Sequence, residues 1–296
     1  MADRAPVLVI AGPTSAGKTA ASLAVAERFG AQLVSADAMQ VYRGMDVGTG
    51  KATAEEQARA PHHGLDVVDP HEPFDANDFV QLADAVCAQH DRVVLVGGTS
   101  LYLRGFQRGF VATPPVDPTL RAELEAVDDL HGELARVDPV LAQRLHPNDR
   151  VRLVRGVEVF RQSGKRLSDL QAAHRQAPDR VGVRGLWLDR EDLDARIDAR
   201  VHRMVDAGYA DEVRRLLDAG YARTLKPMQS LGYRHLADHL LDGLSLDEAL
   251  RRTRRDTRHF ARKQRNWRRQ LGWPEVRGDG VRAAMDTARA AWGPPR

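Results

Sequence analysis

Residues 6–30 read PVLVIAGPTSAGKTAASLAVAERFG. The apolar run Pro6–Ala11 predicts a buried strand, and Lys18–Phe29 predicts a helix that ends at Gly30. Between them, Gly12–Thr19 matches G-x-x-x-x-G-K-[ST] at every fixed position, in the strand–loop–helix context that a P-loop requires. The stretch therefore predicts an α/β fold with a P-loop.

The chemistry of this loop is phosphate binding. Its glycines let backbone N–H groups turn inward around phosphate oxygens, and the helix N-terminus adds partial positive charge. Lys18 supplies a full positive charge, and the Thr19 hydroxyl can coordinate Mg²⁺. We therefore expect a nucleotide or another diphosphate on the loop.

The alternation of strands and helices continues along the chain. Further strands are predicted at Gln32–Ala36, Gly64–Val68, Arg92–Val96 and Val181–Leu188, and helices at Ala76–His90, Asp192–Gly208, Ala210–Leu217 and Leu246–Leu271. This order predicts a parallel sheet with right-handed crossovers. Residues 117–180 are polar and helical in pattern, so we expect a helical insertion there. The core would then comprise residues 1–116 and 181–296, with basic helices near the C-terminus.

Composition limits the class of protein. The 296 residues are 43% hydrophobic, which is enough for a sizeable core. No run approaches the roughly 18 apolar residues of a membrane span, and the first apolar run is too short for a signal peptide. The single cysteine, Cys87, excludes an internal disulfide, and its apolar neighbours predict a buried core position. We expect a cytoplasmic protein without a membrane partner.

The positive charge is unevenly distributed. Residues 251–269 read RRTRRDTRHFARKQRNWRR and carry a local charge of +9 within a total of +3, so the remaining residues sum to −6. Phe260 and Trp267 lie among these charges. This pattern favours a polyanionic partner such as RNA over the alternative, a solvated basic helix face.

Three segments are expected to meet in one crevice, because ligands bind outside the carboxyl ends of parallel strands. The P-loop, Asp37 and Gly97-Gly98-Thr99 each follow a predicted strand, and the strand before Asp37 is expected to neighbour the first one. Asp37 could there act as a general base or a metal ligand. No acid follows Arg92–Val96, where many P-loop NTPases hold Mg²⁺ with an Asp. The loop is thus expected to cradle phosphates rather than to drive nucleotide hydrolysis.

An ordered set of motifs resembles the tRNA dimethylallyltransferase (tRNA isopentenyltransferase) family. The set is GPTSAGKT at 12–19, SADAMQVYRGMDVGTGKA at 35–52, APHHGLDVVDP at 60–70, LVGGTSLYLRG at 95–105, HPNDRVRLVRGVEVFRQSGK at 146–165, SLGYRH at 230–235 and TRHFARKQRNWRR at 257–269. The chain departs from the family at Ala38, where Ser is usual, and at Ala52, where Pro is frequent.

The resemblance implies transfer of a dimethylallyl group from dimethylallyl diphosphate to N6 of the adenosine 3′-adjacent to the anticodon of tRNA. The P-loop ligand would then be the leaving diphosphate, with Mg²⁺ on Thr19 and Arg200 completing the clamp. Asp37 would take the N6 proton, while Thr99 and Arg121 would line the route of the base. The implied diphosphate-binding residues are Gly12, Pro13, Thr14, Ser15, Ala16, Gly17, Lys18, Thr19 and Arg200.

The resemblance also implies three segments that contact the tRNA anticodon stem-loop, while residues 251–269 would attract RNA phosphates without regard to sequence. These segments comprise Asp37, Ala38, Met39, Gln40, Val151, Arg152, Leu153, Val154, Arg155, Gln229, Ser230, Leu231, Gly232, Tyr233 and Arg234. A monomer is expected. The alternatives are a P-loop small-molecule kinase, an adenylate prenyltransferase, and a P-loop RNA-binding protein without transfer chemistry.

Overall fold

A computed structural model describes residues 5–295, so residues 1–4 and 296 of the expected core lie outside the described residues. The chain forms two compact units. One runs to Gln107 and resumes at Arg180, and the other comprises Arg108–Asp179. The two points where the first unit is interrupted lie side by side, because the Arg180 N–H donates to the Gln107 carbonyl at 2.8 Å.

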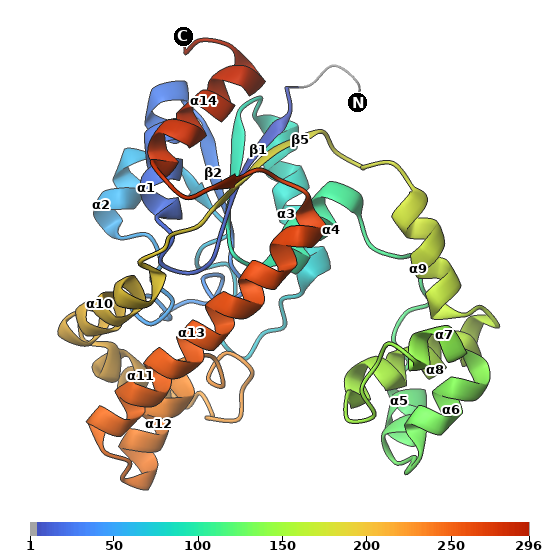
Figure 1. Ribbon diagram of the computed structural model, residues 1–296. Helices are drawn as coiled ribbons and strands as arrows, with labels where there is room; N and C mark the ends of the chain where they lie inside the picture. The colour runs from blue at the N-terminus through green and yellow to red at the C-terminus, as the bar shows by residue number, and fades with distance from the viewer. Residues whose placement is uncertain (1–4, 296) are drawn as a thin grey trace. The chain divides into compact units, whose positions relative to one another are not determined.

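The first unit is built on a sheet in the order β3-β2-β4-β1-β5-β6 (Figure 1). Every pairing among these strands is parallel, and the predicted α/β fold with a parallel P-loop core is confirmed. The strands are β1 (Val7–Ala11), β2 (Gln32–Ala36), β3 (His62–His63), β4 (Val93–Gly97), β5 (Val183–Leu188) and β6 (Glu275–Val276).

Two details of the expected sheet are wrong. β4 lies between β1 and β2, so the strand before Asp37 is not the direct neighbour of the first strand. Residues 64–68 form no strand; Val68 makes only an isolated bridge to Tyr42. Gly64 with φ 78° and Asp66 with φ 53° interrupt extended backbone there, which explains the difference.

Helices cover both faces of this sheet, because alternate residues of β1 point to opposite sides. Val7, Val9 and Ala11 pack in one apolar cluster with α3 (Ala76–Gln89) and α4 (Ser100–Arg108). Leu8 and Ile10 pack in a second cluster with α1 (Lys18–Phe29) and α14 (Gly280–Trp292). Cys87 is only partly buried at the edge of the first cluster.

A third apolar cluster contains residues of the four helices α10, α11, α12 and α13, packed against residues 41–45 after β2. The helices of the first unit are α1 (Lys18–Phe29), α2 (Ala54–Arg59), α3 (Ala76–Gln89), α4 (Ser100–Arg108), α10 (Leu193–Asp206), α11 (Tyr209–Asp218), α12 (Tyr233–Asp242), α13 (Leu246–Leu271) and α14 (Gly280–Trp292). Within residues 5–295, none of the helices has the length and apolar character needed to cross a membrane.

The second unit is helical, and residues 108–179 contain no strand. Its helices are α5 (Pro118–Glu125), α6 (Leu130–Val137), α7 (Pro139–Ala142), α8 (Arg150–Ser163) and α9 (Leu167–Gln176). They surround an apolar cluster of their own that includes Leu134, Leu153 and Val157.

Candidate active site

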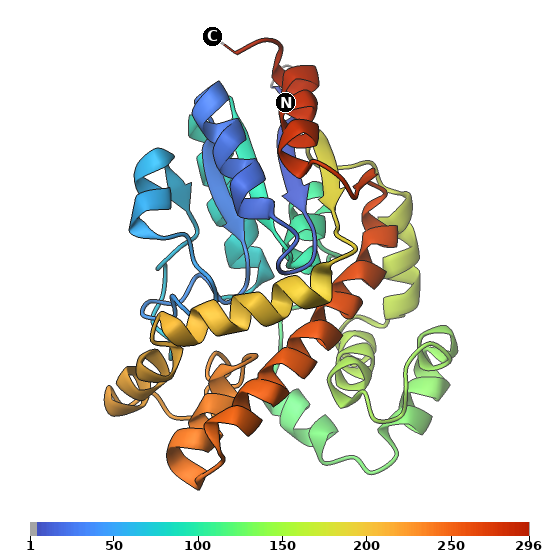
Figure 2. The ribbon, with the colours of Figure 1, turned by 60° about the vertical axis from the view of Figure 1, so that its left-hand side comes forward.

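A cavity of about 770 Å³ opens at the carboxyl edge of the sheet. The P-loop after β1, the Asp37 turn after β2 and Gly97–Thr99 after β4 all line it, as the carboxyl-end rule predicts. Figure 2 shows α10 and α13 crossing below the ends of these strands, and residues of both helices complete the walls. All of the lining residues belong to the first unit.

The P-loop combines a close backbone approach at Gly12 with a left-handed residue at Ser15. A Cβ at Gly12 would lie 2.3 Å from the Leu188 carbonyl oxygen, so β5 approaches too closely for any side chain there. Ser15 adopts a left-handed φ of 66°, and its buried hydroxyl has no hydrogen-bond partner among the described residues. Lys18 Nζ donates to the carbonyls of Gly12 at 3.0 Å and Pro13 at 2.8 Å.

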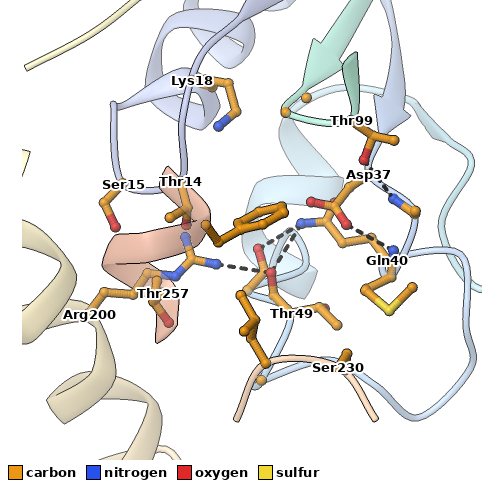
Figure 3. A pocket seen from close by; sticks show the side chains of 18 of the residues that line it. Thr14, Ser15, Lys18, Asp37, Gln40, Thr49, Thr99, Arg200, Ser230 and Thr257 are labelled. Atoms are coloured by element: carbon orange, nitrogen blue, oxygen red, sulfur yellow. Dashed lines mark hydrogen bonds between the residues drawn. The ribbon is translucent and has the colours of Figure 1, made fainter. Parts of the chain in front are cut away.

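Charge at the centre of the cavity is predominantly positive. Figure 3 shows Lys18, Arg200 and Asp37 around one space. Burial lowers the pKa of Lys18 to about 8; the adjacent Arg200 lowers this pKa as well, and Asp37 opposes both effects. Burial also lowers the pKa of Arg200, again opposed by Asp37. Two cations that face one carboxylate in a partly dry cavity suit an anionic ligand.

The Asp37 turn is held in place by Thr99. Thr99 Oγ1 accepts the Ala38 N–H at 3.1 Å, and the Thr99 N–H donates to the Ala36 carbonyl at 3.1 Å. Asp37 Oδ1 accepts the Met39 N–H at 2.9 Å. Within residues 5–295 the second oxygen, Oδ2, accepts no hydrogen bond. A carboxylate fixed in this way can take a proton from a group in the cavity.

A loop at residues 46–50 forms another wall, which the sequence did not reveal as functional. Its Thr49 carbonyl accepts a hydrogen bond from Arg200 Nη2 at 2.9 Å. Gln40 Nε2 donates to the carbonyls of Thr49 at 3.4 Å and Gly50 at 3.2 Å. The loop thus fixes two side chains that were implicated by resemblance.

The basic helix α13 presents a mostly uncharged face to the cavity, with Lys263 as the one basic lining residue among the described residues of this helix. The uncharged lining residues recur at intervals of four and three, which places them on one helix face: Thr253, Thr257, Phe260, Gln264 and Trp267. Sequence reasoning treated this helix as an RNA-binding surface and missed its second role. The regular spacing of uncharged residues among arginines was the signal that could have shown it.

Gln264 joins α13 to the P-loop. Its Oε1 accepts the Thr14 N–H at 3.0 Å, and its Nε2 donates to the Gly98 carbonyl at 3.1 Å. The side chain is buried. A Cβ at Gly98 would lie 2.2 Å from Gln264 Nε2, so this contact needs glycine at that position.

The charge of residues 251–269 is less free than composition suggests. Several arginines form ion pairs with carboxylates of the same unit, namely Arg251, Arg252, Arg255, Arg258, Arg265 and Arg268. Arg265 grips the buried Asp189 through two nitrogens and also donates to the Arg190 carbonyl. Arg265 therefore holds Asp189 and the segment that follows it in place. Among the described residues, no carboxylate pairs with Arg254, Arg262, Lys263 or Arg269.

The expected RNA-contacting segment 229–234 divides in two. Gln229, Ser230, Leu231 and Tyr233 line the cavity. Arg234 instead forms an ion pair with Asp256, which also bonds His235 at 3.0 Å. The Ser230 hydroxyl is buried and has no hydrogen-bond partner among the described residues.

In the second unit, Arg121 and Arg155 both pair with Glu158, whose side chain is fully buried. Arg155 also donates to the Thr113 hydroxyl and the Pro114 carbonyl, so its guanidinium is held within this unit. Leu153 and Val154 lie in the core of this unit, and they cannot present side chains to RNA.

The remaining residues of that segment are exposed. Val151 is 80% exposed, and Arg152 pairs with Asp149 near the start of α8. These two positions are the ones in 151–155 whose side chains are mostly exposed.

Comparison with known proteins gives a consistent result. A family model described as IPP transferase matches residues 40–271. A curated tRNA dimethylallyltransferase of Syntrophotalea carbinolica is 48% identical over 89% of this chain and 88% of its own length. One from Geobacter metallireducens is 46% identical over 93% and 94% of the two chains.

Solved structures agree with these sequence relatives. A tRNA isopentenylpyrophosphate transferase from Bacillus halodurans matches with a TM-score of 0.70 and 32% identity, covering 97% of this chain and 95% of that one. A eukaryotic dimethylallyltransferase described as acting on tRNA matches with a TM-score of 0.77 and 26% identity, over 88% and 69% of the two chains.

Proposed function

Because this chain belongs to the tRNA dimethylallyltransferase family, we propose that it transfers a dimethylallyl group from dimethylallyl diphosphate to N6 of the adenosine 3′-adjacent to the tRNA anticodon. The observation that carries the proposal is one cavity in which Lys18 of the P-loop and Arg200 of α10 face Asp37. An anionic leaving group and a proton acceptor are the two requirements of this transfer.

The P-loop side of the cavity stabilises the leaving group. As the allylic C–O bond breaks, its electron pair goes to the diphosphate, and negative charge builds there. Lys18 and Arg200 are held in place before the reaction, so they favour that charge without further reorganisation. The Ser15 hydroxyl, which has no protein partner among the described residues, is free to donate to the same group.

The Asp37 side accepts the proton. The N6 lone pair is delocalised into the adenine ring, so the amino group is a weak nucleophile. As N6 bonds to the allylic carbon, it becomes more acidic, and Asp37 takes its proton. Thr99 acts as a positioning residue here, because it holds the turn that orients this carboxylate. The adenine must leave the RNA stack to reach the cavity.

The donor set of the P-loop fits Mg²⁺ held together with substrate phosphates. No cluster of three or more His, Cys, Asp or Glu side chains within residues 5–295 could form an all-protein metal site. Mg²⁺ commonly relies on few protein ligands plus phosphate oxygens and water. The Thr19 hydroxyl would be its protein ligand, and the ion would neutralise charge on the diphosphate.

Contacts to tRNA are proposed at residues 37–40, at 229–231 and Tyr233, and on the exposed arginines of α13. Val151, Arg152 and Arg121 of the second unit are proposed as further contacts. We place the reaction in the cytoplasm and expect the protein to act as a monomer.

The experiment is mass analysis of tRNA nucleosides after incubation with dimethylallyl diphosphate and Mg²⁺. We expect a dimethylallyl adenosine at the position next to the anticodon and release of one pyrophosphate per transfer. Parallel reactions contain ATP in place of the allylic donor, or AMP in place of tRNA. Phosphate transfer from ATP would favour the kinase alternative, and prenylation of AMP but not tRNA would favour the adenylate prenyltransferase.

A further inference from the structure

Glu212 on α11 is a buried carboxylate that grips the backbone of the 46–50 loop. Its Oε2 accepts the N–H groups of Asp46 at 3.0 Å and Val47 at 2.7 Å, and its Oε1 accepts the N–H of Gly48 at 3.0 Å. The Tyr233 hydroxyl donates to the same Oε1 at 2.6 Å. The residue is 1% exposed.

This carboxylate has no cationic partner within 4.0 Å among the described residues. An isolated buried carboxylate is costly, and here only the four donors offset that cost. Burial, together with Tyr209 and Glu212, raises the pKa of Tyr233, so the phenol remains a donor. The Glu212 side chain therefore fixes the path of the loop, because both of its oxygens must stay where their donors point.

Tyr209, three residues earlier on α11, fixes the same loop by contact. A Cβ at Gly48 would lie 2.0 Å from the Tyr209 ring, and one at Gly232 would lie 2.2 Å from its hydroxyl. The Tyr209 hydroxyl donates to the Leu231 carbonyl at 3.0 Å. α11 therefore ties the 46–50 loop to the 229–233 segment, and both line the cavity.

The held loop in turn sets the position of Arg200. The Thr49 carbonyl accepts from Arg200 Nη2, and a Cβ at Gly50 would lie 2.2 Å from that nitrogen. The guanidinium thus lies directly against this loop, hydrogen-bonded to Thr49 and too close to Gly50 for a side chain there. Any shift of the loop displaces the charge that faces Lys18 across the cavity.

We propose that Glu212 is a positioning residue, which sets the diphosphate-binding geometry of Arg200 through the 46–50 loop. The inference rests on the proposed function in taking Arg200 as part of the diphosphate clamp. Glu212 itself lines no part of the cavity.

The test is a double-mutant cycle between Glu212→Gln and Arg200→Ala, read as the Kd of pyrophosphate with Mg²⁺ by calorimetry. Glutamine has an NH₂ group in place of one carboxylate oxygen. This NH₂ group cannot accept the hydrogen bonds that were donated to that oxygen. We expect Glu212→Gln alone to weaken pyrophosphate binding about tenfold, the lower end of the loss for outer-shell partners at metal sites. In the Arg200→Ala background it should cost less than about twofold, because the two residues act on one interaction.

Asp211→Asn is the matched control, since Asp211 lies on the same helix, is exposed and, among the described residues, pairs only with Arg214. It should bind pyrophosphate as the wild type does. An equal loss from Glu212→Gln in both backgrounds would mean that Glu212 acts on overall structure, and an unchanged Kd would mean that the loop does not set Arg200. Either result overturns the proposal.

If Glu212→Gln fails to fold, Tyr233→Phe carries the same cycle, because it removes one donor and leaves the carboxylate. We expect a loss of about threefold that disappears in Arg200→Ala. A loss that persists there, or no loss in the first place, overturns the proposal. The assay contains neither tRNA nor allylic donor. A wild type that binds pyrophosphate but fails to prenylate tRNA would therefore refute the proposed function alone.

Discussion

Diphosphate binding should depend on pH through Lys18. Burial and Arg200 lower the pKa of Lys18 to about 8, so its charge changes between pH 7 and pH 9. An ordinary lysine stays charged over this pH interval. The difference from 10.5 corresponds to about 3 kcal/mol that the free protein spends to keep the ammonium charged. A bound polyanion removes that cost, so binding at pH 8 to 9 should take up a proton.

The expected size follows from the fraction of charged lysine. With a pKa of about 8, roughly nine-tenths of Lys18 is protonated at pH 7 and roughly one-tenth at pH 9. If the ammonium is needed, pyrophosphate affinity should fall about tenfold over that interval. Calorimetry in two buffers with different ionisation heats would also report the proton uptake.

Lys18→Met is the reference, because pyrophosphate and Mg²⁺ titrate in the same way with either protein. The ratio of wild-type to Lys18→Met affinity should therefore fall about tenfold from pH 7 to pH 9. The free energy of unfolding of the ligand-free wild type should instead increase with pH. The unfolded chain binds the Lys18 proton more tightly than the folded chain does, so this free energy rises as the pH rises from 8 towards 10.5. A ratio that stays constant across the range, without proton uptake, would refute the reasoning.

Three further outcomes are expected. Asp37→Asn keeps an acceptor for the Met39 N–H but cannot take a proton, so single-turnover transfer should slow by about 10²–10⁴ while pyrophosphate binding is kept; turnover within threefold of wild type would exclude the base role. Arg262→Ala should reduce the slope of log K for tRNA against log salt by about one, as measured by filter binding at several salt concentrations. Arg265→Ala should instead lower the free energy of unfolding by about 2 kcal/mol in a denaturant titration, because it leaves Asp189 without its ion pair. Equal salt slopes for the two variants would contradict the different roles given to these arginines. Gln264→Leu should weaken pyrophosphate binding about fivefold, since the Thr14 N–H loses its acceptor and the P-loop its anchor; an unchanged Kd would show that the loop holds its shape alone.

The parts of the fold that follow from local pattern could be predicted from sequence. The helix Lys18–Phe29 and the strand Gln32–Ala36 have the expected bounds, because apolar period and a terminal glycine act within a few residues. β3 and β6 have only two residues each, too few to produce a period. Their pairing depends on neighbouring strands, and this the sequence does not display.

The same division holds for the site. The P-loop, Asp37 and Thr99 could be placed together because each follows a strand and the carboxyl ends of parallel strands share an edge. Gln264 and Glu212 act across 250 and 166 residues of sequence, on Thr14 and Asp46 respectively. No local pattern encodes such contacts. The ion pairs that occupy Arg265 and Arg155 are equally non-local, so composition overstated the charge that these residues offer to RNA.

The hydrogen bond between Arg180 and Gln107 has a consequence for how this chain can change over time. Because the exit and re-entry points of the core are already in contact, residues 108–179 behave as a cassette spliced into one surface turn. Closing a loop costs free energy only as the logarithm of its length, so a longer, shorter or unrelated cassette alters the stability of the core little. Arg180 strengthens the splice, since its guanidinium holds Asp84 at 2.8 and 3.0 Å and also donates to the Phe106 carbonyl. A lineage could therefore exchange this segment for another, while the residues beside the P-loop are inherited intact.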